Sequence, residues 1–303
     1  MLSINFPVYN YEVGDLVSQL AEQAEELQIG YEIRIYDDGS EESVKLKNCK
    51  IAGLPGVIYS ELEKNIGRSA IRNKMGMESK FKYLLFIDAD SLPISKDYIK
   101  NFIKTIKPNR VLCGGTAYKS EKPNEQNKYL RWFYGTNREA IPAKTRNSKK
   151  GFIITSNNFL IEKSVFEKVH FREDLKTYGH EDTLLGYDLF RNGIEILHID
   201  NPVEHTGLED SDVFIEKTKT ALKSLFQITH QILPGDNDFV QQVHFLHRYS
   251  AITKYLPSMF LRLFYTLFHR FIERNLTGSK PSLYWFDMYK LGFYSTLKQE
   301  ITE

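Results

Sequence analysis

Strand-like and helix-like segments alternate along the first half of the chain, and this alternation is the strongest constraint on its fold. Residues 2–6, 31–36 and 83–87 are short runs rich in Ile, Leu, Phe and Tyr, as in buried β-strands. Between them, residues 14–27 and 68–78 carry apolar side chains at helical intervals. Strands that alternate with helices form βαβ units and a mostly parallel sheet. The sequence therefore predicts an α/β domain.

The second part of the chain has a different pattern. Beyond residue 209 the strand signals fade and helical periodicity takes over. We therefore expect an α/β domain over 1–209 and a helical C-terminal region over 210–303. Residues 119–150 are polar and contain two prolines, which predicts an irregular loop over the edge of the sheet.

The composition excludes some classes of protein. The net charge is only +1, so there is no general electrostatic reason to expect a nucleic acid partner. Cys49 and Cys113 are too few for a disulfide framework, and the first residues lack the pattern of a secretory signal. No uninterrupted apolar run reaches the roughly 18 residues of a membrane span. We therefore expect a cytoplasmic protein.

Acidic residues follow two of the predicted strands. Asp37 and Asp38 come after the second strand, and Asp88 and Asp90 come after the third. In open parallel sheets, ligands bind at the carboxyl ends of the strands. Carboxylate oxygens suit Mg²⁺ or Mn²⁺, and such an ion can bridge the oxygens of a diphosphate. Turns that use these aspartates only to bind local amides are an equally good explanation of either pair alone.

Two basic residues lie on one predicted helix. Arg68 and Arg72 are four residues apart, so one helix face can present both guanidinium groups to phosphates. The alternative is an ion pair with Glu63 or Glu78 on a solvated face.

Glu181 and Asp182 follow a glycine at the start of an apolar-periodic helix. A helix N-terminus favours acidic side chains, which accounts for one of these two carboxylates but does not require both.

Taken together and in order, these motifs resemble those of the family 2 glycosyltransferases of GT-A fold. The resemblance covers roughly residues 2–206, and the helical remainder lies outside it. The matching segments are Phe6-Pro7-Val8-Tyr9-Asn10, Tyr36-Asp37-Asp38-Gly39-Ser40, Asn65-Ile66-Gly67-Arg68-Ser69-Ala70-Ile71-Arg72-Asn73, Phe86-Ile87-Asp88-Ala89-Asp90 and Gly179-His180-Glu181-Asp182.

The resemblance implies a Rossmann-like, mostly parallel central sheet flanked by helices. It also implies an inverting, Mn²⁺- or Mg²⁺-dependent transfer of a sugar from a nucleoside diphosphate donor to a carbohydrate hydroxyl. UDP is the nucleotide expected by analogy, and the acceptor is a glycan or a lipid-linked glycan. The residues it implies for donor binding are Pro7, Tyr9, Asp37, Asp38, Arg68, Arg72, Asp88 and Ala89.

The resemblance also implies the base and the metal ligands. Asp182 would be the general base and Glu181 a contact to the acceptor, and the two roles could be exchanged. Asp90 and His205 would bind the metal, with Asp88 near the ribose or reaching the ion through water. His198 and His180 are less favoured alternatives to His205.

Two further groups are candidates for sugar and phosphate contacts. Ser156 and Asn157 interrupt a strand-like run with groups that suit hydrogen bonds to an acceptor sugar, although a turn explains them nearly as well. A Lys or Arg from residues 144–150 could join Arg68 in offsetting the charge of the departing diphosphate.

The helical region contains an amphipathic stretch with a basic fringe. Apolar residues recur at steps of three and four from Tyr255 to Ile272, and residues 241–303 hold eight Lys and Arg against four Asp and Glu. Three interpretations stay open: packing on the catalytic domain, a homodimer interface, and peripheral attachment to the inner face of an anionic membrane.

Two other functions compete with a glycosyltransferase. A nucleotidyltransferase would combine the same sheet, metal and nucleotide, but it predicts a glycine-rich phosphate loop that residues 5–14 lack. A non-catalytic sugar- or membrane-binding protein of the same fold predicts that the acidic pair at 181–182 is dispensable.

Overall fold

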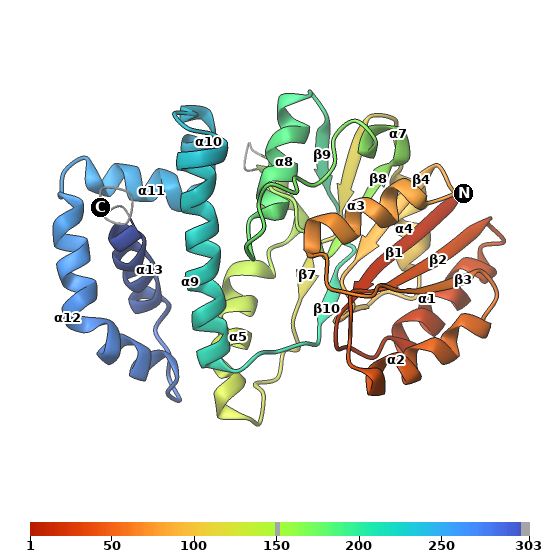
Figure 1. Cartoon of the computed structure of the whole chain (residues 1–303), viewed down its shortest axis with the longest axis horizontal. Coiled ribbons are helices and arrows are strands. Elements are labelled where there is room, and N and C mark those ends of the chain that lie inside the picture. Colours follow the sequence, from red (N-terminus) through yellow and green to blue (C-terminus); the bar gives the residue numbers. More distant parts are fainter. Residues whose placement is uncertain (149–151, 298–303) are drawn as a thin grey trace. The chain divides into compact units, whose positions relative to one another are not determined.

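The computed structural model describes residues 1–148 and 152–297, which group into two compact units (Figure 1). Two segments that precede the predicted boundary, 119–138 and 174–180, pack with the C-terminal helices. The first unit comprises residues 1–118, 139–173 and 181–207, and the second comprises 119–138, 174–180 and 208 onward.

The described residues of the first unit form a seven-stranded sheet of order β3-β2-β1-β4-β8-β6-β9. Strand β8 runs antiparallel to β4 and β6, and the other neighbours are parallel. The mostly parallel α/β sheet predicted from the sequence is therefore confirmed. The strands are β1 (Leu2–Val8), β2 (Tyr31–Asp37), β3 (Val57–Glu61), β4 (Tyr83–Ile87), β6 (Arg110–Cys113), β8 (Asn158–Glu162) and β9 (Glu195–His198).

Side chains of one strand enter two separate cores because they alternate between the faces of the sheet. Leu85 and Ile87 of β4 join the core that α1 and α4 cover, whereas Leu84 and Phe86 join the core beneath α7 and α8. Central strands buried on both faces explain the continuous apolar runs in the sequence. The helices of this unit are α1 (Gly14–Glu26), α2 (Glu42–Asn48), α3 (Arg68–Glu78), α4 (Tyr98–Thr105), α6 (Ala143–Ser148), α7 (Lys163–Phe166) and α8 (Glu181–Arg191).

The first unit also contains a second, three-stranded sheet. It consists of β5 (Ser91–Pro93), β10 (Val203–His205) and β7 (Thr116–Ala117). Strands β5 and β10 are antiparallel, with His205 opposite Ser91. This pairing brings the residues that follow β4 beside a segment more than 100 positions away.

The expectation of an irregular loop over residues 119–150 is wrong for much of its length. It contains α5 (Tyr129–Tyr134) and α6, because apolar side chains such as Leu130 are fully buried and stabilise a helix despite the polar surroundings. Lys149, Lys150 and Gly151 lie outside the described residues.

The second unit is helical, as predicted for the region after residue 209. Its core joins α5, α9, α12 and α13 through Leu130, Ile215, Ile272, Leu276 and Phe286. The helices are α9 (Ser211–Gln227), α10 (Asn237–Gln242), α11 (His244–Thr253), α12 (Ser258–Leu276) and α13 (Leu283–Leu297). Of the helices in the described ranges, none has the length and apolar character needed to cross a lipid bilayer.

Candidate functional site

The acidic turns after β2 and β4 lie at the same edge of the main sheet. Strands β1, β2 and β4 are parallel, with Val8 opposite Asp37 and Asn5 opposite Phe86. The carboxyl ends of all three strands therefore meet, and this is the edge where such sheets bind ligands.

Asp37 and Asp38 have different environments. Asp37 is fully buried and accepts hydrogen bonds from the amide of Ser40 at 2.6 Å and from the hydroxyl of Tyr59 at 3.2 Å. Both of its oxygens are thus engaged in closing the turn. Asp38 accepts from the amides of Ile66 at 2.8 Å and Gly67 at 3.3 Å, just before α3 begins. Burial raises the pKa of Asp38, although these amides oppose the shift.

The turn after β1 is connected to the acidic turn after β2. The amide of Asn10 donates to Ser40 Oγ, and the amide of Glu41 donates to Asn10 Oδ1, both at 2.8 Å. Pro7 is half-buried, whereas Tyr9 is 58% exposed. A flat ligand at this edge can therefore reach the ring of Tyr9.

Arg68 and Arg72 pair with two different carboxylates, one at the start of α8 and one after β4. Arg72 is buried and lies 2.5 Å from Asp88, while Arg68 lies 3.4 Å from Glu181. Glu78, one of the two alternative partners considered for these arginines, binds Lys74, Arg34 and Tyr36 instead. The i, i+4 spacing thus serves two ion pairs within the site.

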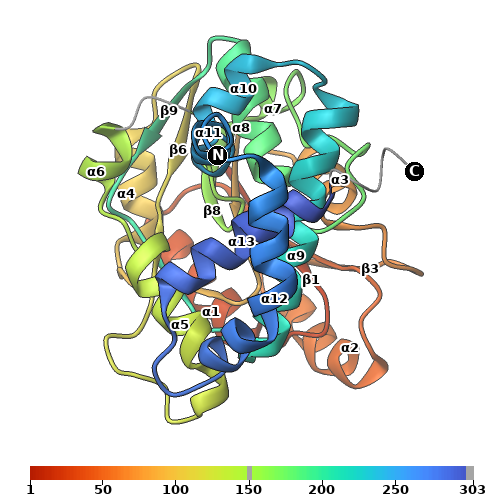
Figure 2. The ribbon, with the colours of Figure 1, turned by 90° about the vertical axis from the view of Figure 1, so that its left-hand side faces the viewer.

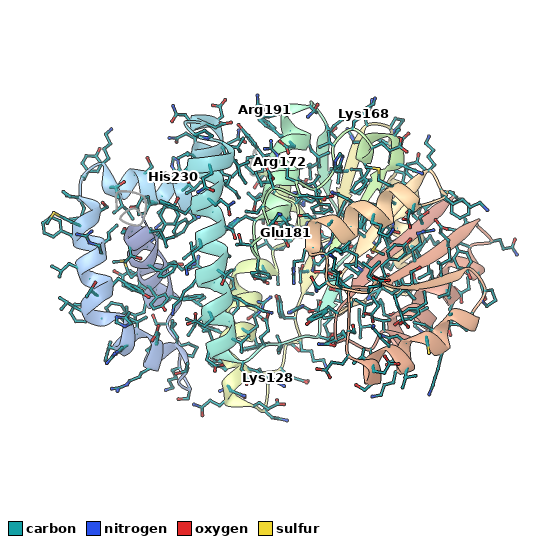
Figure 3. The ribbon with its side chains drawn as sticks, in the orientation of Figure 1. Lys128, Lys168, Arg172, Glu181, Arg191 and His230 are labelled. Atoms are coloured by element: carbon teal, nitrogen blue, oxygen red, sulfur yellow. The ribbon has the colours of Figure 1, made fainter. Side chains whose placement is uncertain are left out.

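Glu181 and Asp182 form the first turn of α8, and Figure 3 shows Glu181 at that end of the helix. Burial opposes ionisation of Glu181, but the charges of Arg68 and Arg72 bring its pKa below the ordinary value. Burial and then the neighbouring charge of Glu181 raise the pKa of Asp182 to about 7. Adjacent carboxyl groups with pKa values shifted in opposite directions are typical of acid–base sites.

His205 and Asp90 meet at the junction of the two sheets. His205 Nδ1 lies 3.5 Å from Asp90 Oδ2, and the amide and hydroxyl of Thr206 donate to the carbonyl of Asp90 at 2.8 and 2.9 Å. A side chain at Gly207 would not fit, because its Cβ would lie 2.6 Å from Asp90 Oδ2. Within the described residues, His205 Nε2 is buried without a hydrogen-bond partner. These contacts keep the Asp90 carboxylate beside Nδ1 of His205, while the second ring nitrogen, Nε2, is the one left without a partner.

This pair fits part of a metal site. A carboxylate and an imidazole suit Mn²⁺, and the unpartnered nitrogen of His205 calls for a ligand. Residues 1–148 and 152–297 contain no group of three or more His, Cys, Asp and Glu side chains able to hold an ion. Asp88, the third predicted ligand, is engaged by Arg72. An ion held by Asp90 and His205 would therefore need further oxygens from a substrate or water.

Ser156 and Asn157 lie just before β8, next to the acidic turn. The carbonyl of Asn157 accepts from the amide of Asp88 at 3.3 Å, and its side-chain amide donates to Thr116 at 2.9 Å. Asn157 Oδ1 is buried and finds no partner in the described part of the chain, and Ser156 is buried. Ala89 is half-buried and packs against the core beneath α1.

The basic stretch at 144–150 has a structural role where it is described. Arg146 is buried, contacts His198 Nδ1 at 2.7 Å and donates to the carbonyls of Gly114 and Ile199. Burial, with help from Arg146, lowers the pKa of His198 to about 4. Arg146 is therefore engaged by the protein itself, and it occupies Nδ1 of His198. Lys149 and Lys150 lie outside the described residues.

Sequence reasoning missed several residues that complete this edge. Tyr118 stacks edge-on against His205 with ring centres 5.6 Å apart, and Tyr11 shares a hydrogen bond with Thr206. The only signal for Thr206 and Gly207 was their position directly after His205. Tyr118 and Tyr11 carried no distinguishing pattern.

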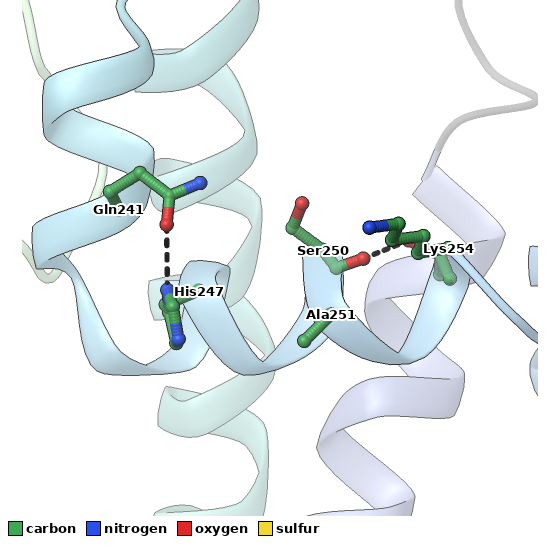
Figure 4. A pocket seen from close by; sticks show the side chains of 6 residues that line it. Gln241, His247, Ser250, Ala251 and Lys254 are labelled. Carbon is green, nitrogen blue, oxygen red and sulfur yellow. Dashed lines mark hydrogen bonds between the residues drawn. The ribbon is translucent and has the colours of Figure 1, made fainter.

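A separate shallow pocket of about 450 Å³ occurs in the helical unit. It is lined by residues of α10, α11 and the turn after α11, and His247 bonds Gln241 across the junction at 2.8 Å (Figure 4). Its lining contains no carboxylate, so it lacks the groups of the sheet edge.

Comparison with known proteins identifies the family of the chain. The sequence profile of the family described as Glycosyl transferase family 2 matches residues 3–169, just over half of the chain. A dolichyl-phosphate beta-glucosyltransferase of Dictyostelium discoideum is 29% identical over 131 residues, which are 39% of this chain and 40% of that protein. The chain therefore spans about two fifths of that relative's length.

Two solved structures share the fold across the whole chain. The mannosyltransferase PcManGT from Pyrobaculum calidifontis, solved with GDP-Man and Mn²⁺, has a TM-score of 0.62 at 14% identity and covers 100% of this chain and 88% of its own. S. aureus TarS 1-349 in complex with UDP-GlcNAc has a TM-score of 0.53 at 16% identity, covering 99% and 91%. The GT-A architecture expected from the sequence is confirmed.

Proposed function

The chain belongs to glycosyl transferase family 2, and we propose that it transfers a sugar from a nucleoside diphosphate donor to a carbohydrate hydroxyl with inversion. Membership of this family favours a glycosyltransferase over the nucleotidyltransferase and the non-catalytic binding protein. The observation that carries the finer proposal is the pairing of His205 with Asp90, which lies two residues after Asp88. Asp88 pairs with Arg72, whose charge also acts on the two carboxylates of α8. We also propose residues 1–209 as the catalytic domain and 210–303 as its helical appendage.

The donor would lie along the carboxyl ends of β1, β2 and β4. Tyr9 and Pro7 would contact the base, and Asp38, with Asp37 behind it, would hold the nucleoside. Arg68, which is half exposed, would approach the diphosphate, while Arg72 keeps Asp88 and Ala89 in place below the ribose. We propose UDP as the nucleotide, and GDP is the alternative because a structural neighbour is solved with GDP-Man.

Asp90 and His205 would hold Mn²⁺ or Mg²⁺, with Asp88 nearby. When bound, the ion supplies positive charge to the oxygens of the departing diphosphate. The neighbour that contains Mn²⁺ and the unpartnered nitrogen of His205 support this assignment.

Asp182 would act as the general base. Its carboxylate takes the proton of the acceptor hydroxyl while the oxygen forms a bond to the anomeric carbon. The bond from that carbon to the diphosphate breaks on the opposite face, and the nucleoside diphosphate leaves with the electron pair. Glu181, Ser156 and Asn157 would orient the acceptor sugar, a glycan or a lipid-linked glycan; the name of the Dictyostelium relative points to a lipid phosphate acceptor.

A thermal-shift screen tests the donor site, because a ligand that binds only the folded state raises the melting temperature. Nucleoside diphosphate sugars of uridine and guanosine are compared with and without Mn²⁺ or Mg²⁺. We expect a metal-dependent rise for one of them, and the same sugar should be transferred in an activity assay. Stabilisation by no nucleotide diphosphate with either metal would contradict the proposal.

We place the protein in the cytoplasm, at the inner face of a membrane. Contact with that membrane would involve the helical unit rather than the sheet edge, and homodimer formation would be a competing use of the same helices.

A further inference from the structure

We infer that the outer face of α12 binds the surface of an anionic lipid bilayer. This membrane-binding face consists of the exposed apolar residues of α12 and the turn before it, together with the cationic side chains among them. The inference goes beyond the transfer reaction and does not depend on any of its residues.

Helix α12 is apolar on two opposite faces. Leu261, Ile272 and Leu276 are buried, and the half-buried Tyr265 packs on Tyr289 and Phe293 of α13. Figures 1 and 2 show α13 between α12 and α9, so one face of α12 is covered by α13. The opposite face needs another explanation.

That opposite face is unusually exposed for apolar side chains. Phe260, Leu263, Leu267 and Phe271 recur at steps of three and four, which places them in one stripe. They are 50%, 55%, 65% and 64% exposed. Other exposed apolar side chains of this stretch are Tyr255, Leu256, Met259 and Phe268. Contiguous apolar surface of this kind marks an interaction site, whereas single exposed residues need no explanation.

The charged side chains around this apolar stripe are mostly cationic, which favours an anionic partner. Residues 254–284 contain five Lys and Arg and one acidic residue, Glu273. Lys254, Arg270, Arg274 and Lys280 are exposed, whereas Glu273 is half-buried and binds Tyr289 and Lys219. The surface is therefore apolar and positive, and long cationic side chains can lie beside an apolar stripe with their charges toward lipid headgroups.

A second copy of the chain fits this surface less well. Symmetric dimers join the same patch of both subunits, so this positively charged patch would be buried against a patch of the same charge. Like charges brought together weaken such an interface, whereas phosphate groups of an anionic bilayer neutralise them.

Vesicle flotation with the full chain tests the inference. Vesicles of phosphatidylcholine alone are compared with vesicles that also contain phosphatidylglycerol, at low and high salt. We expect the protein to float with the anionic vesicles at low salt and binding to weaken by at least about tenfold at high salt, because exposed charges are screened. Failure to bind anionic vesicles, or equal binding to both kinds, overturns the inference.

Matched variants locate the face. Leu267→Glu with Phe271→Glu should lower vesicle binding at least about tenfold without loss of folding, since both side chains face solvent. Leu46→Glu, on α2 and 57% exposed, is the control and should bind like the unmodified protein. Equal binding by the double variant and the control would overturn the assignment to α12.

Charge variants and the oligomeric state complete the test. Arg270→Gln with Arg274→Gln should weaken binding about tenfold or more, whereas Lys50→Gln with Lys96→Gln should not. A dimer in lipid-free solution that Leu267→Glu dissociates would overturn the inference in favour of self-association. The thermal shift given by a nucleotide sugar should be unchanged in every variant, so failure here is distinguishable from failure of the proposed transfer.

Discussion

The guanidinium group of Arg72 lies 2.5 Å from the carboxylate of Asp88 and joins helix α3 to the acidic turn after β4. The side chain of Arg72 is only 2% exposed and its guanidinium lies over the ring of Phe171. Its charge also favours ionisation of Glu181 and Asp182. One buried cation therefore influences three carboxylates at the proposed site, and its removal has measurable consequences.

We expect Arg72→Met to lower the free energy of unfolding by about 2–4 kcal/mol, because a buried charge pair loses one partner. Urea unfolding followed by circular dichroism measures the change. Lys74→Met is the control on the same helix: its ion pair with Glu78 is well exposed, so the cost should stay within about 0.5 kcal/mol. Similar losses in both variants would show that Arg72 is not a buried structural charge.

The activity of the enzyme should rise with pH and level off above a midpoint near 7. The reason is that Asp182, the proposed base, has a pKa of about 7 and must be ionised to accept a proton. In Asp182→Asn, the transfer rate should fall by about 10²- to 10⁴-fold and the midpoint should disappear. The measurement is the pH profile of kcat/KM.

Glu181→Gln separates the two carboxyl groups. The pKa of Glu181 is lowered, so this group is already ionised near neutral pH and its replacement should leave a rising limb in the profile. Donor-induced thermal stabilisation should survive in Asp182→Asn. A limb near pH 7 that persists in Asp182→Asn but vanishes in Glu181→Gln would exchange their roles.

Asp182→Asn should also change how stability depends on pH. A carboxyl group whose pKa is raised on folding favours the folded state while it is protonated. This contribution is fully present below its unfolded pKa of about 4 and is lost as the pH rises to about 7. Relative to the unmodified protein, the variant should therefore gain stability between these values and show a constant difference above them. Chemical unfolding of both proteins at matched pH values measures this. A difference in unfolding free energy that stayed constant between about pH 4 and pH 7 would refute it.

The main sheet was predictable because its physical causes are local to each strand. Leu84 to Ile87 is a continuous apolar run, and only a strand buried on both faces accounts for it alongside the neighbouring helical patterns. The ends of such strands place Asp38 and Asp88 at one edge without further information.

The burial of individual charges was not predictable. Arg72 belongs to an i, i+4 pair that resembles a solvated helix face, and only packing against Phe171 shows that it is buried. Arg146 lies in a polar, basic segment, yet carbonyls from three separate loops surround it. The approach of Asp90 to His205 depends on strands more than 100 residues apart, which no local pattern encodes.

His205→Asn should weaken metal-dependent stabilisation of the enzyme. We expect the apparent affinity for Mn²⁺ in the presence of a nucleoside diphosphate to fall at least about tenfold, because one of the two proposed protein ligands is lost. A titration of the melting temperature with Mn²⁺ measures it. His247→Asn, on an exposed histidine of the helical unit, should leave the titration unchanged. Identical curves for the two variants would remove His205 from the metal site.

Gly207→Ala should also weaken Mn²⁺-dependent stabilisation, in this case by displacing the carboxylate of Asp90. The added Cβ would lie 2.6 Å from Asp90 Oδ2 and 2.9 Å from Asp90 Cβ, so the carboxylate has to move. We expect the Mn²⁺ concentration needed to raise the melting temperature to increase by roughly tenfold. The free energy of unfolding should fall by about 1–3 kcal/mol at most. Gly14→Ala is the matched control, because a Cβ there meets nothing within 4 Å. If Gly207→Ala titrates like Gly14→Ala, the position of the Asp90 carboxylate does not govern metal binding, and the proposed pairing of Asp90 with His205 as ligands is wrong.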